Sequence, residues 1–221
     1  MPSLILFLCA GSARAQISSA NYTFLVASGL LCNADDSATC PAVVKSANDD
    51  SYEMSGAGMF DAQGKSVTAA GTFAHKSSNG TVLETGVWIA SRLISFDSYG
   101  IAPGPLMGGG RALGPPQFGP RRWPMFSGSM AAGGRAVFRI RLLPVRGEPK
   151  IALLQVNCAR GNVPPEHQVE GIRLALQGSS SAFDEEVSGH TLFVLTRPGT
   201  TATKAPAPAV DTNRAPDEVE H

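Results

Sequence analysis

The stretch that decides the fold runs from Ser51 to Phe96 and reads SYEMSGAGMFDAQGKSVTAAGTFAHKSSNGTVLETGVWIASRLISF. It contains three runs in which apolar and polar residues alternate, a pattern typical of half-buried β-strands. Two turn signals separate the runs, Asp61–Lys65 and Asn79–Gly80, and the second favours a type I′ turn. The stretch therefore predicts a three-stranded antiparallel meander.

The alternation also assigns side chains to a face of each predicted strand. One face holds Tyr52, Met54, Gly56, Gly58 and Phe60 in the first run and Val67, Ala69, Gly71 and Phe73 in the second. Glycines on this face indicate close approach between strands or a bulge. The third run, Thr81–Phe96, is long enough for a bend near Ser91, and we expect Trp88 to anchor the core.

Further strand candidates lie on both sides of the meander, at 21–31, 41–46, 136–143, 151–158, 172–176 and 191–197. Pro165–Gln168 is expected to form a helical turn, and the segment from Gly178 through Asp184–Glu186 to form a loop. Together with the meander this gives eight or nine strands with β-type spacing. We predict an all-β fold, an antiparallel β-sandwich, with a closed β-barrel as the alternative.

The N-terminal residues 1–15 resemble a signal peptide, with an apolar run followed by Ala13-Arg14-Ala15 before Gln16. This predicts a secreted or periplasmic protein. No other segment has the ~20 apolar residues of a membrane-spanning helix, so none is expected. The predicted organisation is a signal peptide, one β domain over 16–198, and a disordered tail over 199–221 rich in Pro, Ala and Thr.

Three cysteines follow the predicted signal peptide. Cys32 and Cys40 flank a polar loop, and a disulfide across it is the natural interpretation in an oxidising compartment. Cys158 ends an apolar run, as expected for a small buried hydrophobic residue. Sequence alone leaves all three pairings open.

A long basic loop insertion is predicted over residues 99–135, which are rich in Gly and Pro and therefore unsuited to a continuous helix or central strand. Residues 101–150 carry eight basic side chains and one acidic one, a net charge of +7 in a chain that is neutral overall. Such a segment can meet an anionic surface, although pairing with the acidic flanks is the simpler explanation. The candidate binding residues are Arg111, Arg121, Arg122, Trp123, Arg139 and Arg141; the last two alternate on one strand and should project together.

Enzymatic chemistry has little support in the sequence. It contains no nucleophile elbow, phosphate loop or dinucleotide fingerprint, and no cofactor, metal site or specific nucleic-acid partner is predicted. His167, with its acidic neighbours Glu166 and Glu170, is best explained as part of a solvated loop. An enzyme would have to assemble its site from loops, with Asp35, His75 or His190 as candidates.

Several segments resemble an uncharacterised family of secreted bacterial β-rich proteins: 40–80 (CPAVVKSANDDSYEMSGAGMFDAQGKSVTAAGTFAHKSSNG), 95–104 (SFDSYGIAPG), 136–144 (AVFRIRLLP), 153–178 (LLQVNCARGNVPPEHQVEGIRLALQG) and 186–195 (EVSGHTLFVL). The resemblance implies an exported bacterial protein and carries no activity with it. We therefore expect a non-enzymatic binding or structural domain of the cell envelope, with an anionic envelope component or a protein as partner. The alternative is a hydrolase-type enzyme with a loop-assembled site.

Overall fold

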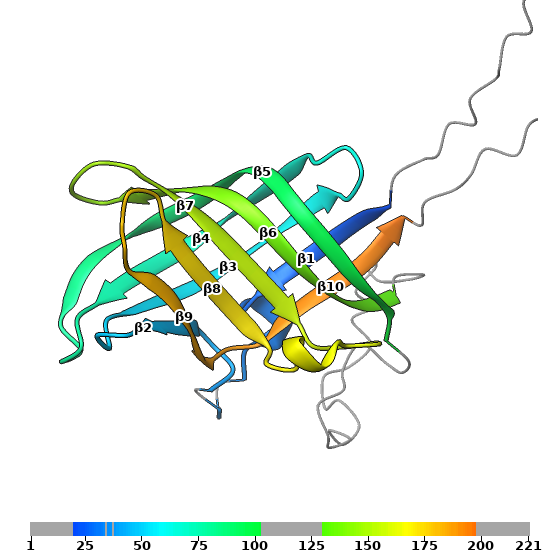
Figure 1. Ribbon diagram of the computed structural model, residues 1–221, viewed down its shortest axis with the longest axis horizontal. Coiled ribbons are helices and arrows are strands. Elements are labelled where there is room, and N and C mark those ends of the chain that lie inside the picture. The colour runs from blue at the N-terminus through cyan, green and yellow to red at the C-terminus, as the bar shows by residue number, and fades with distance from the viewer. Residues whose placement is uncertain (1–19, 34, 37, 103–129, 198–221) are drawn as a thin grey trace, which may run out of the picture. The chain divides into compact units, whose positions relative to one another are not determined.

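The computed structural model describes residues 20–33, 35–36, 38–102 and 130–197 and is almost entirely β-structure (Figure 1). Its strands are β1 (Asn21–Val26), β2 (Ala42–Ser46), β3 (Ser51–Asp61), β4 (Val67–Lys76), β5 (Val82–Ile101), β6 (Met130–Pro144), β7 (Lys150–Cys158), β8 (Gly171–Leu176), β9 (Ala182–Ser188) and β10 (Thr191–Arg197). Two short 3₁₀ turns, η1 (Gly29–Leu31) and η3 (Pro165–His167), complete the described elements. The predicted all-β fold and the helical turn after Pro164 are confirmed.

The strands form one antiparallel sheet in the order β1-β10-β6-β5-β4-β3-β2-β9-β8-β7, with additional pairings β1–β3 and β6–β7. Because of these two pairings the sheet folds back on itself. The hydrogen-bonded neighbours lead from β3 through β4, β5, β6, β7, β8, β9 and β2 back to β3. A sandwich-like or barrel-like fold describes this arrangement, in agreement with the sequence.

The predicted meander is confirmed as β3–β4–β5. Its first turn is held by the Asp61 carboxylate, which accepts the backbone N–H groups of Gln63 and Gly64. Its second turn is not the predicted type I′ turn: Gly80 has a φ of +83°, but Asn79 does not lie in the left-handed region. Gly80 N–H donates to Ser77 O at 2.8 Å, so Ser78 and Asn79 are the central residues of the turn and Gly80 follows them. The meander is therefore specified by local turn chemistry and by period-two alternation.

The core consists of aromatic and aliphatic side chains on the inner face of the sheet. Trp88 is fully buried, and its Nε1 donates to Ser55 O at 3.1 Å. A Cβ at Gly71 would lie 2.5 Å from Trp88 Nε1 and 1.9 Å from Ser55 O, so the indole fits only because this position has no side chain. The prediction that the meander glycines mark close approach is borne out at Gly71.

Three expectations about local structure need correction. The predicted loop after Gly178 contains the strand β9, which pairs with β2 and β8. The strand was missed because it contains three consecutive acidic residues, Asp184–Glu186, and only Phe183 is buried. The ends of the predicted loop insertion 99–135 are also strand, because β5 continues to Ile101 and β6 begins at Met130. Finally, the strand candidate 21–31 ends at Val26, and its last three residues form η1 instead.

Other predictions lie outside the described residues: the signal peptide 1–15, the tail 199–221, and residues 103–129 of the insertion. Across the described ranges, no helix has the length and apolarity required to cross a bilayer.

Candidate anion-binding face

The outer side of β6 presents two exposed arginines. Arg139 and Arg141 alternate with the fully buried Phe138, Ile140 and Leu142, so a period of two turns both guanidinium groups away from the core. The expectation that these two side chains project from the same strand face is confirmed.

Arg92 on β5 joins them, and the sequence did not identify it. The pairing of β5 with β6 shifts register between Ala90 and Arg92, so that Arg92 stands opposite Arg139 while Leu93 turns inward. Ser91 in the same bulge donates its hydroxyl to Arg139 O at 3.1 Å. The bend expected near Ser91 was the available signal, but its effect on side-chain direction could not be derived from alternation.

Several other basic side chains in the described part of the chain pair with carboxylates. Arg135 pairs with Asp97 at 2.8 Å, Lys150 with Glu84 at 2.6 Å and Arg173 with Glu186 at 2.7 Å. None of the ion pairs among the described residues involves Arg92, Arg139 or Arg141. Like charges directly opposite on neighbouring strands are destabilising, so the Arg92–Arg139 pair has an unfavourable electrostatic energy. We call these three residues the arginine strip.

Apolar surface borders the arginine strip on both sides. The cross-strand neighbours of Arg141 are Ile89 and Ile151, and Leu153 lies opposite Arg139 on β7. Two surface hollows flank the strip on this sheet. One, of about 510 Å³, is lined by Ala57, Val67, Thr68, Ala69, Ala70, Ile89 and Ala90; the other, of about 300 Å³, by Arg139, Ile151, Ala152, Leu153, Ala175, Leu176 and Gln177.

The other candidate binding residues from the sequence, Arg111, Arg121, Arg122 and Trp123, lie outside the described residues. Their part in an anion-binding site stays a prediction.

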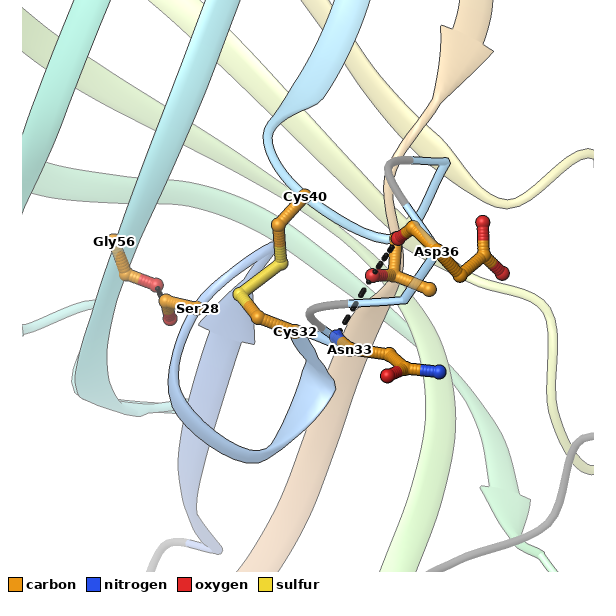
Figure 2. Close-up of a disulfide and its surroundings, with 7 residues drawn as sticks. Ser28, Cys32, Asn33, Asp36, Cys40 and Gly56 are labelled. Carbon is orange, nitrogen blue, oxygen red and sulfur yellow. Dashed lines mark hydrogen bonds between the residues drawn. A yellow bond between two sulfur atoms is a disulfide. The ribbon is translucent and has the colours of Figure 1, made fainter.

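Cys32 and Cys40 are joined in a disulfide with their Cα atoms 5.3 Å apart (Figure 2). Inside the loop, Thr39 Oγ1 donates to Asp36 O at 2.7 Å and accepts the backbone N–H of Asn33 at 3.0 Å. Ser28, just before the loop, donates to Gly56 O on β3 at 2.7 Å (Figure 2). The disulfide therefore closes a loop that is also tied to the sheet by hydrogen bonds.

The residues considered for an enzyme site lie on different elements. His75 is the penultimate residue of β4, and its ring stacks on that of Tyr52 with the centroids 4.5 Å apart. Burial is the main cause that lowers the pKa of His75. His190 Nδ1 lies 3.7 Å from Glu170 Oε1, beyond hydrogen-bond distance. Asp35 uses its backbone N–H to bond the side chain of Asn33 in the disulfide loop. No hydrogen bond or ion pair in the described part of the chain joins any two of these three candidates, and the enzyme alternative stays a prediction.

The loop predicted around His167 is largely exposed to solvent, and His167 also joins a network of polar side chains. Arg135 bridges Asp97 and His167, with His167 Nε2 2.8 Å from Arg135 Nη1. Asn157, which is buried, accepts from the Tyr99 hydroxyl and donates to two carbonyls of the β7–β8 loop. These bonds fix the loop that contains η3.

Cys158 lies beside this cluster as a buried free thiol. Burial, and secondarily the charge of Glu170, raises the pKa of the Cys158 thiol to about 12. The thiol is therefore protonated at neutral pH. A protonated, buried thiol fits the predicted role of a small hydrophobic core residue and does not fit a reactive nucleophile.

Across the described ranges, no group of three or more His, Cys, Asp or Glu side chains is placed to hold a metal ion. No protein-family model, no curated protein and no solved structure matches this chain.

Proposed function

We propose that this chain is an exported, non-enzymatic binding domain of the bacterial cell envelope, and that the arginine strip attaches it to an anionic envelope component. The observation that carries the proposal is the set of three exposed arginines on one sheet face, none of which takes part in an ion pair among the residues that the structure describes. Export is supported by the Cys32–Cys40 disulfide, because such bonds persist mainly in oxidising compartments.

The energetics of the arginine strip favour binding over a structural role. Opposed like charges lower the stability of the isolated protein, so the strip has no evident benefit for folding. An anionic ligand would remove the repulsion and gain charge-assisted hydrogen bonds to the guanidinium groups, which are well suited to carboxylate, sulfate and phosphate. The apolar border lowers the local dielectric and thereby strengthens these contacts.

Retention on a dextran sulfate matrix tests the proposal, because this polymer carries negative charge and no alkyl chain. We expect Arg139→Gln/Arg141→Gln to weaken binding of the full chain by about thirtyfold at low salt, since each arginine at an anionic surface contributes about 1 kcal/mol. The difference between wild type and variant should shrink as salt shortens the Debye length to about 8 Å at 0.15 M.

Arg173→Gln is the matched control, because Arg173 is already paired with Glu186 through two of its nitrogens. It should reduce retention far less than the double variant. A third variant, Arg121→Gln/Arg122→Gln, separates the strip from the basic segment between β5 and β6. If only this third variant lowers retention, the arginine strip is not the binding site and the proposal fails.

A further inference from the structure

Three titratable side chains meet on the inner side of the sheet, at the end where β3 and β5 begin and β4 ends. Tyr52 on β3 stands directly opposite His75 on β4, and His75 stands directly opposite Glu84 on β5. Alternation from buried neighbours on the same three strands turns all three side chains inward; these neighbours are Met54, Phe73 and Trp88. A histidine, a phenol and a carboxylate are therefore adjacent at this end of the fold.

The His75 ring packs against two aromatic rings and has no partner at Nε2. It stacks on Tyr52 with the ring centroids 4.5 Å apart and the planes at 5°, and it meets Phe183 edge-on at 5.9 Å. Neither His75 Nε2 nor Tyr52 Oη, both of which are buried, has a hydrogen-bond partner in the described part of the chain. Burial is the main cause that lowers the pKa of His75, so the imidazole is neutral at pH 7.

Glu84 lies between this histidine and a lysine of another strand. Its Oε2 pairs with Lys150 Nζ on β7 at 2.6 Å, and its side chain is only 12% exposed. After burial, the charge of Glu84 is a further cause that raises the pKa of Tyr52, which confirms that the carboxylate faces the stacked rings. Since the Cβ atoms of directly opposite residues lie about 5 Å apart, Glu84 is within reach of His75 as well as of Lys150.

The other charges near His75 are already engaged. Asp50, whose charge raises the pKa of His75, accepts the backbone N–H of Ser78 at 3.0 Å and the side-chain amide of Asn48 at 3.1 Å. Glu53 and Lys76, which flank the stack on β3 and β4, pair with each other. Glu84 is therefore the carboxylate for which a protonated His75 competes, and Lys150 is its competitor.

We propose that His75, Glu84 and Lys150 form an acid-responsive switch, in which protonation of His75 draws the Glu84 carboxylate away from Lys150 and loosens the contact between β5 and β7. A protonated imidazole gains an N–H donor and a positive charge opposite the carboxylate, while Lys150, whose side chain is 42% exposed, can turn to water. The unfolded chain takes up this proton as the pH falls through 6.5, before the folded chain does, so stability declines below that pH. The inference does not depend on the proposed function.

Hydrogen exchange of the full-length protein at pH 7.5 and pH 5.0, corrected for the intrinsic pH dependence of exchange, tests the proposal. The reporter is the Val145 amide, which donates to Thr85 O at 2.8 Å, next to Glu84. We expect its protection to be about fivefold lower at pH 5.0, the effect of losing one partly exposed ion pair. The Ala62 amide, which donates to Ala20 O at 3.0 Å at the opposite end of β3, is the internal control and should keep its protection.

Two variants separate the switch from a general effect of acid. His75→Phe keeps an aromatic ring on Tyr52 and removes the titrating group, so protection of Val145 should change by less than about twofold between the two pH values. Glu84→Gln, which leaves the stacked rings in place, should expose Val145 to faster exchange already at pH 7.5 and add little at pH 5.0. Glu53→Gln removes a carboxylate from the outer face and is the matched control; it should retain the full response.

Titration of the His75 ring by proton–carbon NMR tests the coupling directly. Lys150→Met removes the competing cation and should raise the pKa of His75, whereas Glu84→Gln removes the attracting charge and should lower it. An unchanged His75 titration in both variants would show that the histidine and the ion pair are not coupled, and would refute the proposal. Acid-dependent exchange of Val145 that is as large in His75→Phe as in the wild type would refute it as well.

Discussion

At the scale of single residues, Gly71 shows how a missing side chain determines the packing of the largest one. Its position beneath Trp88 allows the indole to reach Ser55 O. We expect Gly71→Ala to lower the free energy of unfolding by about 1–3 kcal/mol, the usual effect of overpacking a filled core. Urea denaturation measures this as a lower midpoint at an unchanged slope.

Gly64→Ala in the neighbouring hairpin is the matched control for that prediction. The three atoms nearest to a Cβ at Gly64 would all belong to the Asp61 carboxylate, at 3.2–3.3 Å, and a shift of a few tenths of an ångström relieves these contacts. Its effect should stay within about 0.5 kcal/mol. If both variants lose the same free energy of unfolding, the packing of the Trp88 indole does not depend on the missing side chain at Gly71.

Of the three residues of the arginine strip, two could be predicted from the sequence and one could not. Arg139 and Arg141 were predicted because alternation is regular on β6. Arg92 was not, because one extra residue in the β5 bulge reverses the direction of the side chains that follow it. A bulge depends on how two strands pair in the fold, so it cannot be derived from the alternation of residues within one strand.

At the scale of elements, the disulfide loop between β1 and β2 forms backbone hydrogen bonds with the turn between β9 and β10. The N–H groups of Gly189 and His190 donate to Ala38 O and Thr39 O at 2.8 and 3.1 Å. We expect Cys32→Ser/Cys40→Ser to lower the free energy of unfolding by about 2–3 kcal/mol, the loop-closure effect for a separation of 8 residues. Amide exchange at positions 189 and 190 should accelerate, because their acceptors lie in the loosened loop.

Reduction provides the internal control for the disulfide prediction. Wild type in dithiothreitol should match the double variant in urea unfolding, and the variant itself should not respond to the reductant. Unchanged stability in both cases would show that the hydrogen bonds of Thr39 alone hold the loop.

Elements with strong turn signals were predicted well, and those without were not. The meander carries Asn79-Gly80 and a carboxylate-capped turn, so β3 and β4 were found with nearly correct ends, whereas β5 runs five residues past its predicted end at Phe96. β9 has three consecutive acidic residues and acquires its strand conformation from β2 and β8 on either side. Its structure follows from tertiary pairing, which overrides local propensity.

At the scale of the whole molecule, the choice between a sandwich and a closed sheet rests on two pairings, β1–β3 and β6–β7. Each of these strands already has a neighbour along the sheet order, so the extra pairings arise because β3 and β6 use different parts of their length for different partners. Strand patterns in a sequence specify which face is buried and leave partner choice open. Fold class was therefore predictable, and strand order was not.

The same folding-back brings aromatic side chains from many strands onto Phe60 of β3. Its ring centroid lies 4.9–6.0 Å from those of Tyr22, Phe24, Phe96, Phe138 and Phe193, which come from β1, β5, β6 and β10. We expect Phe60→Ala to lower the free energy of unfolding by about 3–5 kcal/mol, because the truncation leaves a cavity among these aromatic rings.

Val187→Ala is the control, at a side chain on β9 that is 49% exposed; it should change the free energy of unfolding by less than about 0.5 kcal/mol. Thermal and urea unfolding followed by both near- and far-ultraviolet circular dichroism should remain single coincident transitions in both variants. Separate transitions for Phe60→Ala would contradict this expectation and would show that β1 and β10 unfold independently of the meander once the Phe60 ring is removed.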